Sequence, residues 1–528
     1  MQGTAPDDAR HVDADAVSRI LAAANLSGKL RGTWSLGLLS ATTGAERARW
    51  LDDASVERGG TIEPLAHFAL ARATRLARDG DAAVGGVLTA THRRLTDDFR
   101  LLPASAWVGG VDGRLRFGGG DWDLTGSLLG SRLAGDADAI AAVKRNPVHR
   151  HQRPDAAHLD LDPDATAMRG WSAMASIAKN AGRWRGTLAA HAVSPGFDAN
   201  DLGFHTASDF RRVHTLLGYQ QNEPGHFRRW WWWLNSWSTW TTGGEHVALG
   251  SQLNGNVELR NLWLVNASVR RDQPALSPAW ARGGPAVRTP GRTRVNLTVA
   301  TDTRRTVGAT VAGSVTQGDE GERVWRVAPM LRVRPAARAD LSVQPSVQVA
   351  RDPVQWIGRV GAVDAPAYLA GDLRQTTTAL TARLDVAFTR SLSLSVFAQP
   401  FLSEGRYDVV RRLAEPRAGD LARRFATLGE AAVERGAERW ALDLDADGAA
   451  DATIGNPAFD VAELKSNVVL RWQLRPGSTI SAIWGQGRAA REPLTGEEDD
   501  GLAADVRDLW RLPATDVLLV KWSWWIGR

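Results

Sequence analysis

The chain has 528 residues, a net charge of only +5 and no cysteine, which excludes disulfides, thiolate metal sites and cysteine nucleophiles. Its mean hydropathy is -0.26, and no apolar run approaches the ~18 to 20 residues of a membrane-spanning helix. The basic residues are not concentrated in one patch, which argues against nucleic acid as a partner.

Glycine and tryptophan are unusually frequent, with 52 and 23 residues, beside only 3 tyrosines. Tryptophan prefers water-lipid boundaries, where its ring is buried and its N–H stays wet. Together with the period-2 alternation described below, this composition favours a membrane β-barrel. A large soluble β-sandwich or propeller is the alternative.

In chain order, a polar segment (residues 1–19) without an apolar signal-peptide core comes first. Ten predicted hairpins then follow, each made of two alternating segments around a short turn. They cover residues 20–39, 64–95, 107–133, 171–193, 211–240, 246–269, 294–315, 324–349, 380–401 and 467–488. A last amphipathic strand, Val517 to Ile526, closes the chain, where barrel-assembly recognition is usually placed.

The third hairpin shows how the two faces of these strands differ. Trp107 and Val111 alternate with Asp112, Arg114 and Arg116. A face with two arginines is unsuited to lipid and is expected to face a wet lumen. The same alternation makes three further arginines lumen-lining candidates: Arg383, Arg471 and Arg475.

The tryptophans are expected to form girdles at the two membrane boundaries. In the run Trp230 to Trp233, neighbouring residues point to opposite faces, so two of the four are predicted to lie in a girdle and two to point inward. The girdle candidates are Trp107, Trp230, Trp232, Trp472, Trp522 and Trp524.

Tight turns alternate with long polar links at 136–168, 272–292 and 403–459; within the last, Leu421 to Arg435 is predicted to be helical. The regular alternation of tight turns with long links predicts an all-β fold, a large antiparallel transmembrane β-barrel of about 20–22 strands over residues 20–528. The short turns would be periplasmic and the long loops extracellular. Residues 1–19 would be an extracellular loop. Ten hairpins and one single strand give about 21 strands, whereas bacterial barrels normally have an even number of strands. We therefore expect a first strand and an export signal to be missing before Met1.

Several motifs resemble the barrel region of the family called domain of unknown function 5916 (DUF5916). They span nearly the whole chain in order: Leu26-Ser27-Gly28-Lys29 before Trp34 to Leu39, Gln152-Arg153-Pro154-Asp155, Ser194-Pro195-Gly196-Phe197, Asn200 to Phe204, Ala398 to Phe401, and Asn456-Pro457 through Arg475 to Thr479. Ala458 and Asp460 depart from the family's usual acidic residue and asparagine. The resemblance implies an outer-membrane location, with outer-membrane lipid and the barrel-assembly machinery as partners. A carbohydrate-binding module of the family 9 type often precedes such barrels.

Candidate chemistry is sparse. Asp443, Asp445, Asp447 and Asp451 resemble the start of a calcium loop, but its twelfth position is Ile454, which cannot supply the bidentate carboxylate. A solvated acidic loop is the favoured interpretation. A second acidic loop surrounds His158, and His149 and His151 near it could bind metal adventitiously. No Gly-x-Ser-x-Gly or His-Glu-x-x-His motif occurs, so neither an enzyme nor a cofactor is predicted.

Two functional classes therefore remain. The first is a channel or uptake component for oligosaccharides or other nutrients, with the arginines lining its lumen. The second is a non-conducting barrel that anchors or displays an upstream sugar-binding module or aids secretion. A carbohydrate-active enzyme ranks third, because it would need carboxylates or histidines converging in one loop pocket.

Overall fold

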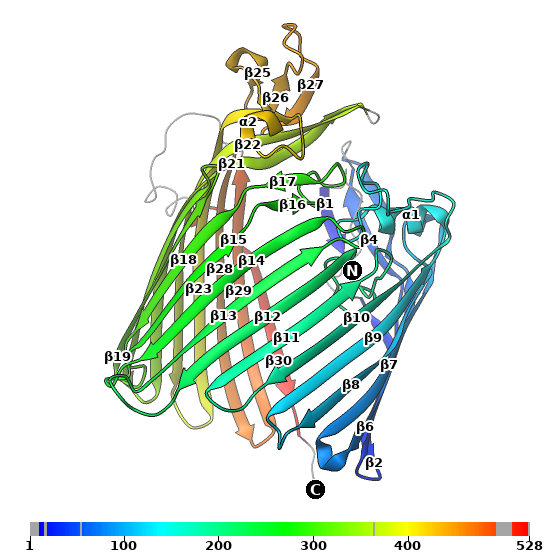
Figure 1. Ribbon diagram of the computed structural model, residues 1–528. Helices are drawn as coiled ribbons and strands as arrows, with labels where there is room; N and C mark the ends of the chain where they lie inside the picture. Colours follow the sequence, from blue (N-terminus) through cyan, green and yellow to red (C-terminus); the bar gives the residue numbers. More distant parts are fainter. Residues whose placement is uncertain (1–9, 15–17, 53–54, 363–364, 493–508, 526–528) are drawn as a thin grey trace. The chain divides into compact units, whose positions relative to one another are not determined.

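The computed structural model describes residues 10–14, 18–52, 55–362, 365–492 and 509–525. Among these residues, twenty-two strands belong to the sheet of one antiparallel β-barrel, which confirms the predicted fold class (Figure 1). No helix in the described part of the chain is both long and apolar enough to cross a membrane. Residues 1–9, 15–17 and Ile526, which belong to the predicted first segment and last strand, lie outside the described residues.

The chain divides into two compact units, which we describe separately. The N-terminal unit comprises residues 1–218, 235–249 and 276–287, and the C-terminal unit comprises residues 219–234, 250–275 and 288–528. Three strands contribute residues to both units: β12 (Phe210–Gln221), β13 (Arg229–Trp240) and β14 (His246–Glu258). Residues of both units also occur in two short strands that pair with each other, β16 (Ala275–Ser277) and β17 (Val287–Thr289).

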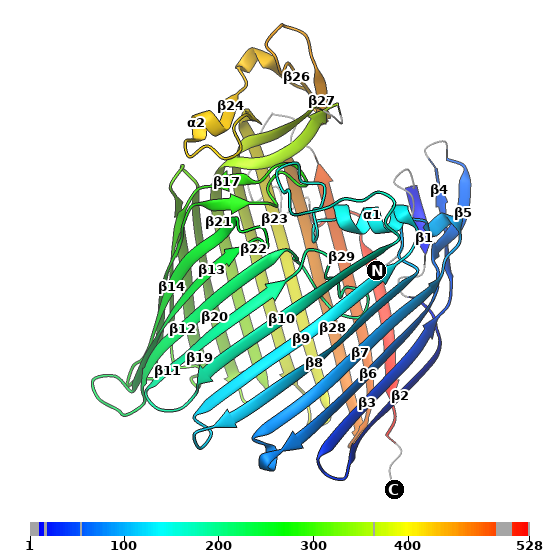
Figure 2. The same ribbon diagram turned by 45° about the vertical axis from the view of Figure 1, so that its right-hand side comes forward.

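The N-terminal unit is built on eight long strands that pair in sequence order. They are β2 (Ile20–Leu30), β3 (Trp34–Thr43), β6 (Leu65–Ala77), β7 (Ala82–Arg94), β8 (Ser105–Phe117), β9 (Trp122–Ala134), β10 (Ala167–Lys179) and β11 (Trp184–Val193). A small separate sheet and three short helices lie in the connections: β1 (Arg10–Ala14), β4 (Glu46–Leu51), β5 (Glu57–Glu63), η1 (Arg78–Gly80), η2 (Asp97–Phe99) and α1 (Ala137–Arg145). Figure 2 shows α1, β4 and β5 beyond the ends of the long strands.

The C-terminal unit contains ten long strands that also pair in order. They are β15 (Leu264–Asp272), β18 (Arg292–Ala300), β19 (Val307–Gly318), β20 (Arg323–Ala336), β21 (Ala339–Gly361), β22 (Pro366–Ala387), β23 (Leu392–Leu413), β28 (Phe459–Arg475), β29 (Ser478–Glu492) and β30 (Thr515–Ser523). Its short elements are α2 (Leu421–Arg424), β24 (Phe425–Thr427), η3 (Glu430–Ala432), β25 (Val433–Arg435), β26 (Arg439–Leu442) and β27 (Ala452–Gly455).

The predicted helix from Leu421 to Arg435 is wrong beyond its first turn. The helix ends at Arg424, because Phe425 to Thr427 instead form a strand that pairs with the end of β23. Strands β21 to β23 have 22 or 23 residues, about twice the length needed to cross a membrane. Their excess length contributes Leu369 and Val410 to a hydrophobic cluster with residues of β25 and β26. The long link predicted at 403–459 is therefore a folded part of this unit.

The strands are two-faced, as the alternation predicts. In the C-terminal unit, Asn254, Ser268 and Asn296 pair directly across three neighbouring strands, and Asn296 Nδ2 donates to Ser268 Oγ at 2.9 Å. Leu253 and Val269, each one position away, also face each other across the strands, and both are about half exposed. We call these two sides of each sheet the polar face and the apolar face.

Candidate functional site

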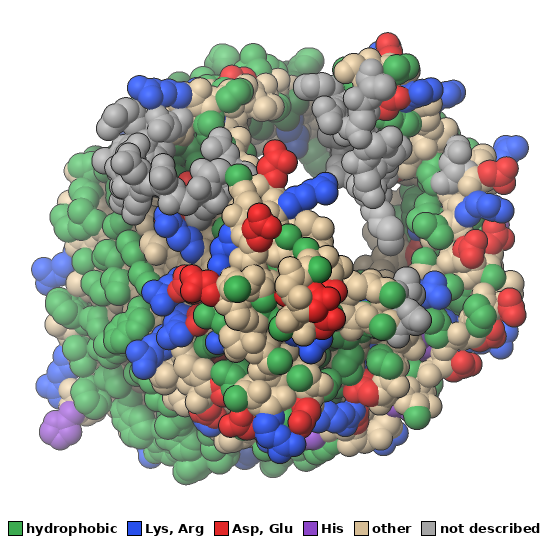
Figure 3. All heavy atoms as spheres, turned by 90° about the horizontal axis from the view of Figure 1, so that it is seen from above, with side chains coloured by type: hydrophobic (Ala, Val, Ile, Leu, Met, Phe, Trp, Pro, Cys, Tyr) green, Lys and Arg blue, Asp and Glu red, His purple; other side chains and the backbone are tan. Residues whose placement is uncertain are grey.

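Three connections of the N-terminal unit gather at one end of its sheet. They join β9 to β10, β11 to β12 and β13 to β14, and they lie at the same end because successive strands run in opposite directions. The first two are long, at residues 135–166 and 194–209. Figure 3 shows the loop end from above, where Asp and Glu side chains lie among Lys and Arg side chains. We call the interacting residues of these three connections the loop network.

A hydrophobic contact holds the first connection against the sheet. Ala106, Leu133 and Met168 pair directly across β8, β9 and β10 on the polar face. Ile140 of α1 packs on this row and is fully buried, with Leu133 only 2% exposed. At this end the polar face is therefore covered by α1 and is not open to water.

The second connection crosses the same face one step further along the strands. An added Cβ at Gly170 of β10 would lie 2.0 Å from the backbone nitrogen of Phe197, so only glycine allows the approach. Gly170 pairs with Ser131 of β9, whose hydroxyl accepts the backbone N–H of Asp198 at 3.0 Å. The segment from Ser194 to Asp198 is thus fixed directly on the sheet.

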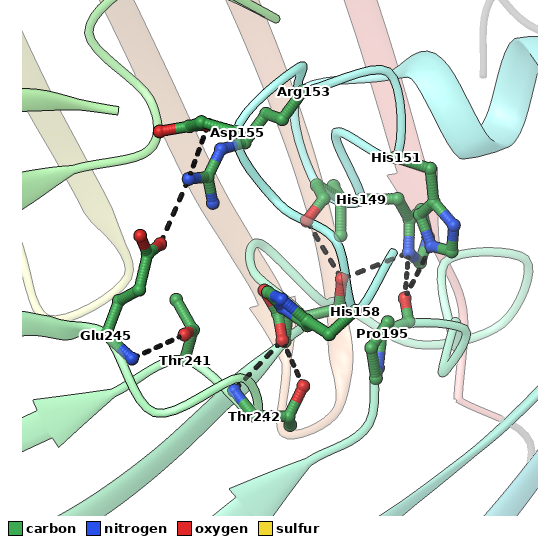
Figure 4. A network of polar contacts seen from close by, with 12 residues as sticks. His149, His151, Arg153, Asp155, His158, Pro195, Thr241, Thr242 and Glu245 are labelled. Carbon is green, nitrogen blue, oxygen red and sulfur yellow. Dashed lines mark hydrogen bonds and ion pairs between the residues drawn. The ribbon is translucent and has the colours of Figure 1, made fainter. Parts of the chain in front are cut away.

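His149 joins the first connection to the second through both ring nitrogens. Nδ1 lies 2.8 Å from the carbonyl oxygen of Pro195 (Figure 4). Nε2 lies 2.9 Å from a carboxylate oxygen of Asp198. His149 is 2% exposed and Asp198 4%. Burial raises the pKa of Asp198, but hydrogen bonds from His149 and Asn200 outweigh this effect, so its pKa lies below the usual value.

The first connection contacts the turn between β13 and β14 through Arg153, and it contacts the second connection through His158. Arg153 donates to Asp155 at 2.9 Å and to Glu245 at 3.1 Å, and its side chain is 1% exposed. His158 Nε2 lies 2.9 Å from Asp209, whose other carboxylate oxygen accepts the backbone N–H of Thr242 at 3.0 Å. The loop network therefore links all three connections through buried charges.

Ser208, His149 and Asp198 form a chain of hydrogen bonds that resembles a hydrolytic triad in composition only. Ser208 Oγ lies 3.1 Å from His149 Nδ1, but it donates to the carbonyl of Val148 at 3.0 Å. The carbonyl oxygen of Pro195 only accepts hydrogen bonds, so His149 Nδ1 acts as the donor to it. A ring that donates at Nδ1 cannot take the Ser208 proton, so this arrangement does not activate a nucleophile.

The sequence placed His149 and His151 only as adventitious metal ligands. His151 Nδ1 lies 2.8 Å from the carbonyl of Asp160, and Nε2 lies 3.4 Å from that of Pro195. Burial lowers the pKa of His151, against the opposite effect of these two carbonyls. The motifs behind the family resemblance gave the signal that could have located the network, because Arg153, Pro195 and Phe197 all belong to it.

The five candidate lumen arginines have different surroundings. Arg114 donates to Asp123 at 2.6 Å, and Arg116 lies 3.8 Å from Asp81. In the C-terminal unit, Arg383 lies over the ring of Phe397 at 5.3 Å. Arg471 pairs directly with Ser393 and Ser481, on the face opposite Trp472.

Arg475 is affected by a bulge between Gln473 and Arg475, which interrupts the alternation of β28. Its guanidinium lies 4.1 Å from the centre of the Trp524 ring and donates to the carbonyl of Trp525 at 3.1 Å. The bulge therefore places Arg475 against an aromatic residue at the turn end of the strand. Arg471, four residues earlier, keeps the regular alternation.

The tryptophan candidates lie near the ends of strands. Trp107 is 45% exposed on the apolar face of β8, and Trp472 and Trp522 both pair with Ile480 in one row. Trp522 and Trp524 pack edge to face, with ring centroids 5.8 Å apart. Two more candidates, Trp230 and Trp232, are half-buried in β13, and the Trp230 ring packs against Tyr219 at 5.3 Å.

The predicted acidic loop connects β26 and β27. Ligand atoms of Asp443, Asp445 and Asp447 all lie within 4.8 Å of one another. Asp443 accepts backbone N–H groups from Gly448 at 2.9 Å and Ala446 at 2.6 Å. The fourth candidate, Asp451, accepts the backbone N–H of Leu444 at 2.6 Å. Hydrogen bonds to the backbone, chiefly that of Gly448, lower the pKa of Asp443.

Comparison with known proteins adds a family but no function. No relative among the curated proteins matches the sequence. Among solved structures, the chain is similar to an anion-selective porin from Comamonas acidovorans, with 11% identity and a TM-score of 0.29 over 67% of this chain and 100% of the porin. It is also similar to the outer membrane transporter YddB from Escherichia coli, with 8% identity and a TM-score of 0.36 over 89% of this chain and 74% of the transporter. A family model described as domain of unknown function (DUF5916) matches residues 141–527, so the chain belongs to that family.

Proposed function

We propose that this protein is an outer-membrane β-barrel that takes up oligosaccharides or other small hydrophilic nutrients through its lumen. The observation that carries the proposal is the two-faced strand. The row Asn254, Ser268 and Asn296 is unsuited to lipid, whereas the adjacent row Leu253 and Val269 is suited to it. A sheet of this size with such faces fits a membrane barrel with a wet interior.

Arginines on the polar face would contact a passing solute. Arg471 lies between Ser393 and Ser481, which leaves its guanidinium beside small hydroxyl side chains. Amide, hydroxyl and guanidinium groups are suitable partners for sugar hydroxyls. The proposed partners are thus outer-membrane lipid on the apolar face, oligosaccharide on the polar face, and the barrel-assembly machinery at the last strand.

A second candidate follows from the loop network. Because α1 and the segment from Ser194 to Asp198 lie on the polar face, the loops could close the lumen instead of narrowing it. The protein would then be a non-conducting barrel that anchors or displays an upstream sugar-binding module or aids secretion. We propose no enzymatic activity, because the Ser208, His149 and Asp198 chain lacks a general base.

Conductance of the refolded full chain in a planar bilayer tests the proposal. Large steady channels that a neutral oligosaccharide such as maltohexaose blocks would support uptake. The variant Arg471→Gln should weaken this block, whereas Leu470→Val, its matched control on the apolar face, should not. A folded, heat-resistant barrel that never conducts would contradict the uptake proposal and favour the second candidate.

A further inference from the structure

A polar pocket of about 390 Å³ lies at the loop end of the C-terminal unit. Four segments line it: Pro274 after β15, residues 288–291 before β18, Asp319 and Glu320 in the turn between β19 and β20, and residues 419–421 with Arg424 at α2. The volume falls within the usual range of small-molecule sites, about 300 to 1,000 Å³. None of the functions considered above uses this pocket.

The three carboxylates of the pocket already have partners. Glu320 forms an ion pair with Arg424. Asp319 accepts two hydrogen bonds from Arg271, both at 2.7 Å. Asp420 accepts the backbone N–H groups of Ala422 at 2.9 Å and Arg423 at 3.2 Å. Each carboxylate of the pocket is therefore already held by at least one hydrogen bond or ion pair.

The donors of the pocket are not all used. The Arg424 side chain is 1% exposed, and its Nη1 donates to the carbonyl of Ala418 at 2.9 Å. Its Nε is buried without a hydrogen-bond partner in the described part of the chain. The Arg288 guanidinium also lines the pocket, and none of its contacts within the described ranges is a hydrogen bond or ion pair. Among the described residues that line the pocket, Arg288 is therefore the cation left for an anionic ligand.

We propose that this pocket binds the carboxylate of a small acidic solute, of which uronic acids are an example. Arg288 would supply the planar pair of N–H groups that matches a carboxylate. Thr289, also in the pocket wall, would offer a hydroxyl to the solute, and the buried Arg424 would add positive charge behind the wall. A role of this binding in uptake rests on the proposed function. The binding itself does not depend on that function.

Calorimetric titration of the refolded full chain in detergent tests the pocket directly. The probes are D-galacturonate and D-galactose, which differ by the carboxylate. We expect galacturonate to bind at least about tenfold more tightly than galactose, as for a charge-assisted hydrogen bond. Equal binding of the two sugars, or no binding of galacturonate, would overturn the proposal.

Variants distinguish the pocket from general charge effects. Arg288→Gln should weaken galacturonate binding about tenfold or more. Arg305→Gln, an exposed arginine in the tight turn between β18 and β19, is the matched control and should leave it unchanged. Glu320→Gln should strengthen binding, because it removes a negative charge from the pocket wall and leaves the charge of Arg424 uncompensated. Unchanged affinity in Arg288→Gln would refute the assignment. Conductance is measured on the same samples, because it tests the uptake proposal independently of galacturonate binding. A failure of one proposal can therefore be told from a failure of the other.

Discussion

Replacement of Asp198 by alanine should open the loop network without unfolding the sheet. In the native protein its carboxylate accepts hydrogen bonds from His149 Nε2 at 2.9 Å, from the Asn200 backbone N–H at 2.8 Å and from Asn200 Nδ2 at 3.2 Å. The alanine variant leaves all three donors without this acceptor. The contact with His149 is the most costly to lose, because the His149 side chain is fully buried.

The expected magnitude follows from these bonds. Three lost hydrogen bonds to a buried carboxylate, at about 1 to 1.5 kcal/mol each, sum to about 3 to 4.5 kcal/mol. Since about 1.4 kcal/mol corresponds to a factor of ten, the population of the opened loop should rise by roughly two to three orders of magnitude.

Hydrogen exchange of the Ser208 amide is a suitable measurement. That N–H donates to the carbonyl of Val148 at 3.2 Å and joins the two long connections without contacting Asp198 itself. Asp123→Ala is the control, because it removes a partly exposed ion pair with Arg114 at the opposite end of β9 from the loop network, where solvent screens the charges. Ser208 exchange that stays within a few-fold of wild type in Asp198→Ala would refute the reasoning.

Three further predictions concern other parts of the chain. Burial raises the pKa of Asp198 but its hydrogen bonds lower it further, so its contribution to loop stability is complete above pH about 4 and is lost as pH falls further. Acid should therefore lower the protection factor of the Ser208 amide, which corrects the exchange rate for its intrinsic pH dependence, far more in wild type than in Asp198→Asn. Trp472→Ala should lower the free energy of unfolding in lipid vesicles by about 1 to 3 kcal/mol, whereas the loop variant Trp510→Ala should not. Addition of EDTA should leave the thermal midpoint unchanged within about 1 °C, because backbone N–H groups already hold Asp443; a calcium-dependent rise would show a bound ion.

Local alternation predicted the barrel strands well because each strand lies between two different media. The predicted pairing across Pro476-Gly477 is confirmed, with Arg475 opposite Ser478 and Gly477 in the left-handed region at φ 82°. The bulge before Arg475 was not predictable, because apolar and polar residues keep alternating in the sequence through Arg475. The extensions of β21 to β23 were missed because they pack against a small sheet, which no local period encodes.

The loop network was missed for a related reason. Its contacts join residues far apart in the sequence, such as His149 and Asp198, and no spacing rule relates them. Glycine offered a partial signal, because Gly170 interrupts an otherwise regular strand at the point where Phe197 crosses it. Whether the five arginines line a conducting lumen stays a prediction.

Substitution of Gly170 separates the two proposed functions. Its added Cβ would lie 2.0 Å from the Phe197 nitrogen, and the backbone there can yield only by lifting the segment from Ser194 to Asp198 off the sheet. Gly28→Ala is the control, because its Cβ would meet nothing within 4 Å. If the loops only narrow a pore, the wild type should conduct and Gly170→Ala should raise its conductance. If the loops close the barrel, the wild type should not conduct and Gly170→Ala should. Equal conductance in wild type and Gly170→Ala would show that this segment does not restrict the lumen, because lifting it would then change nothing along the path of the solute.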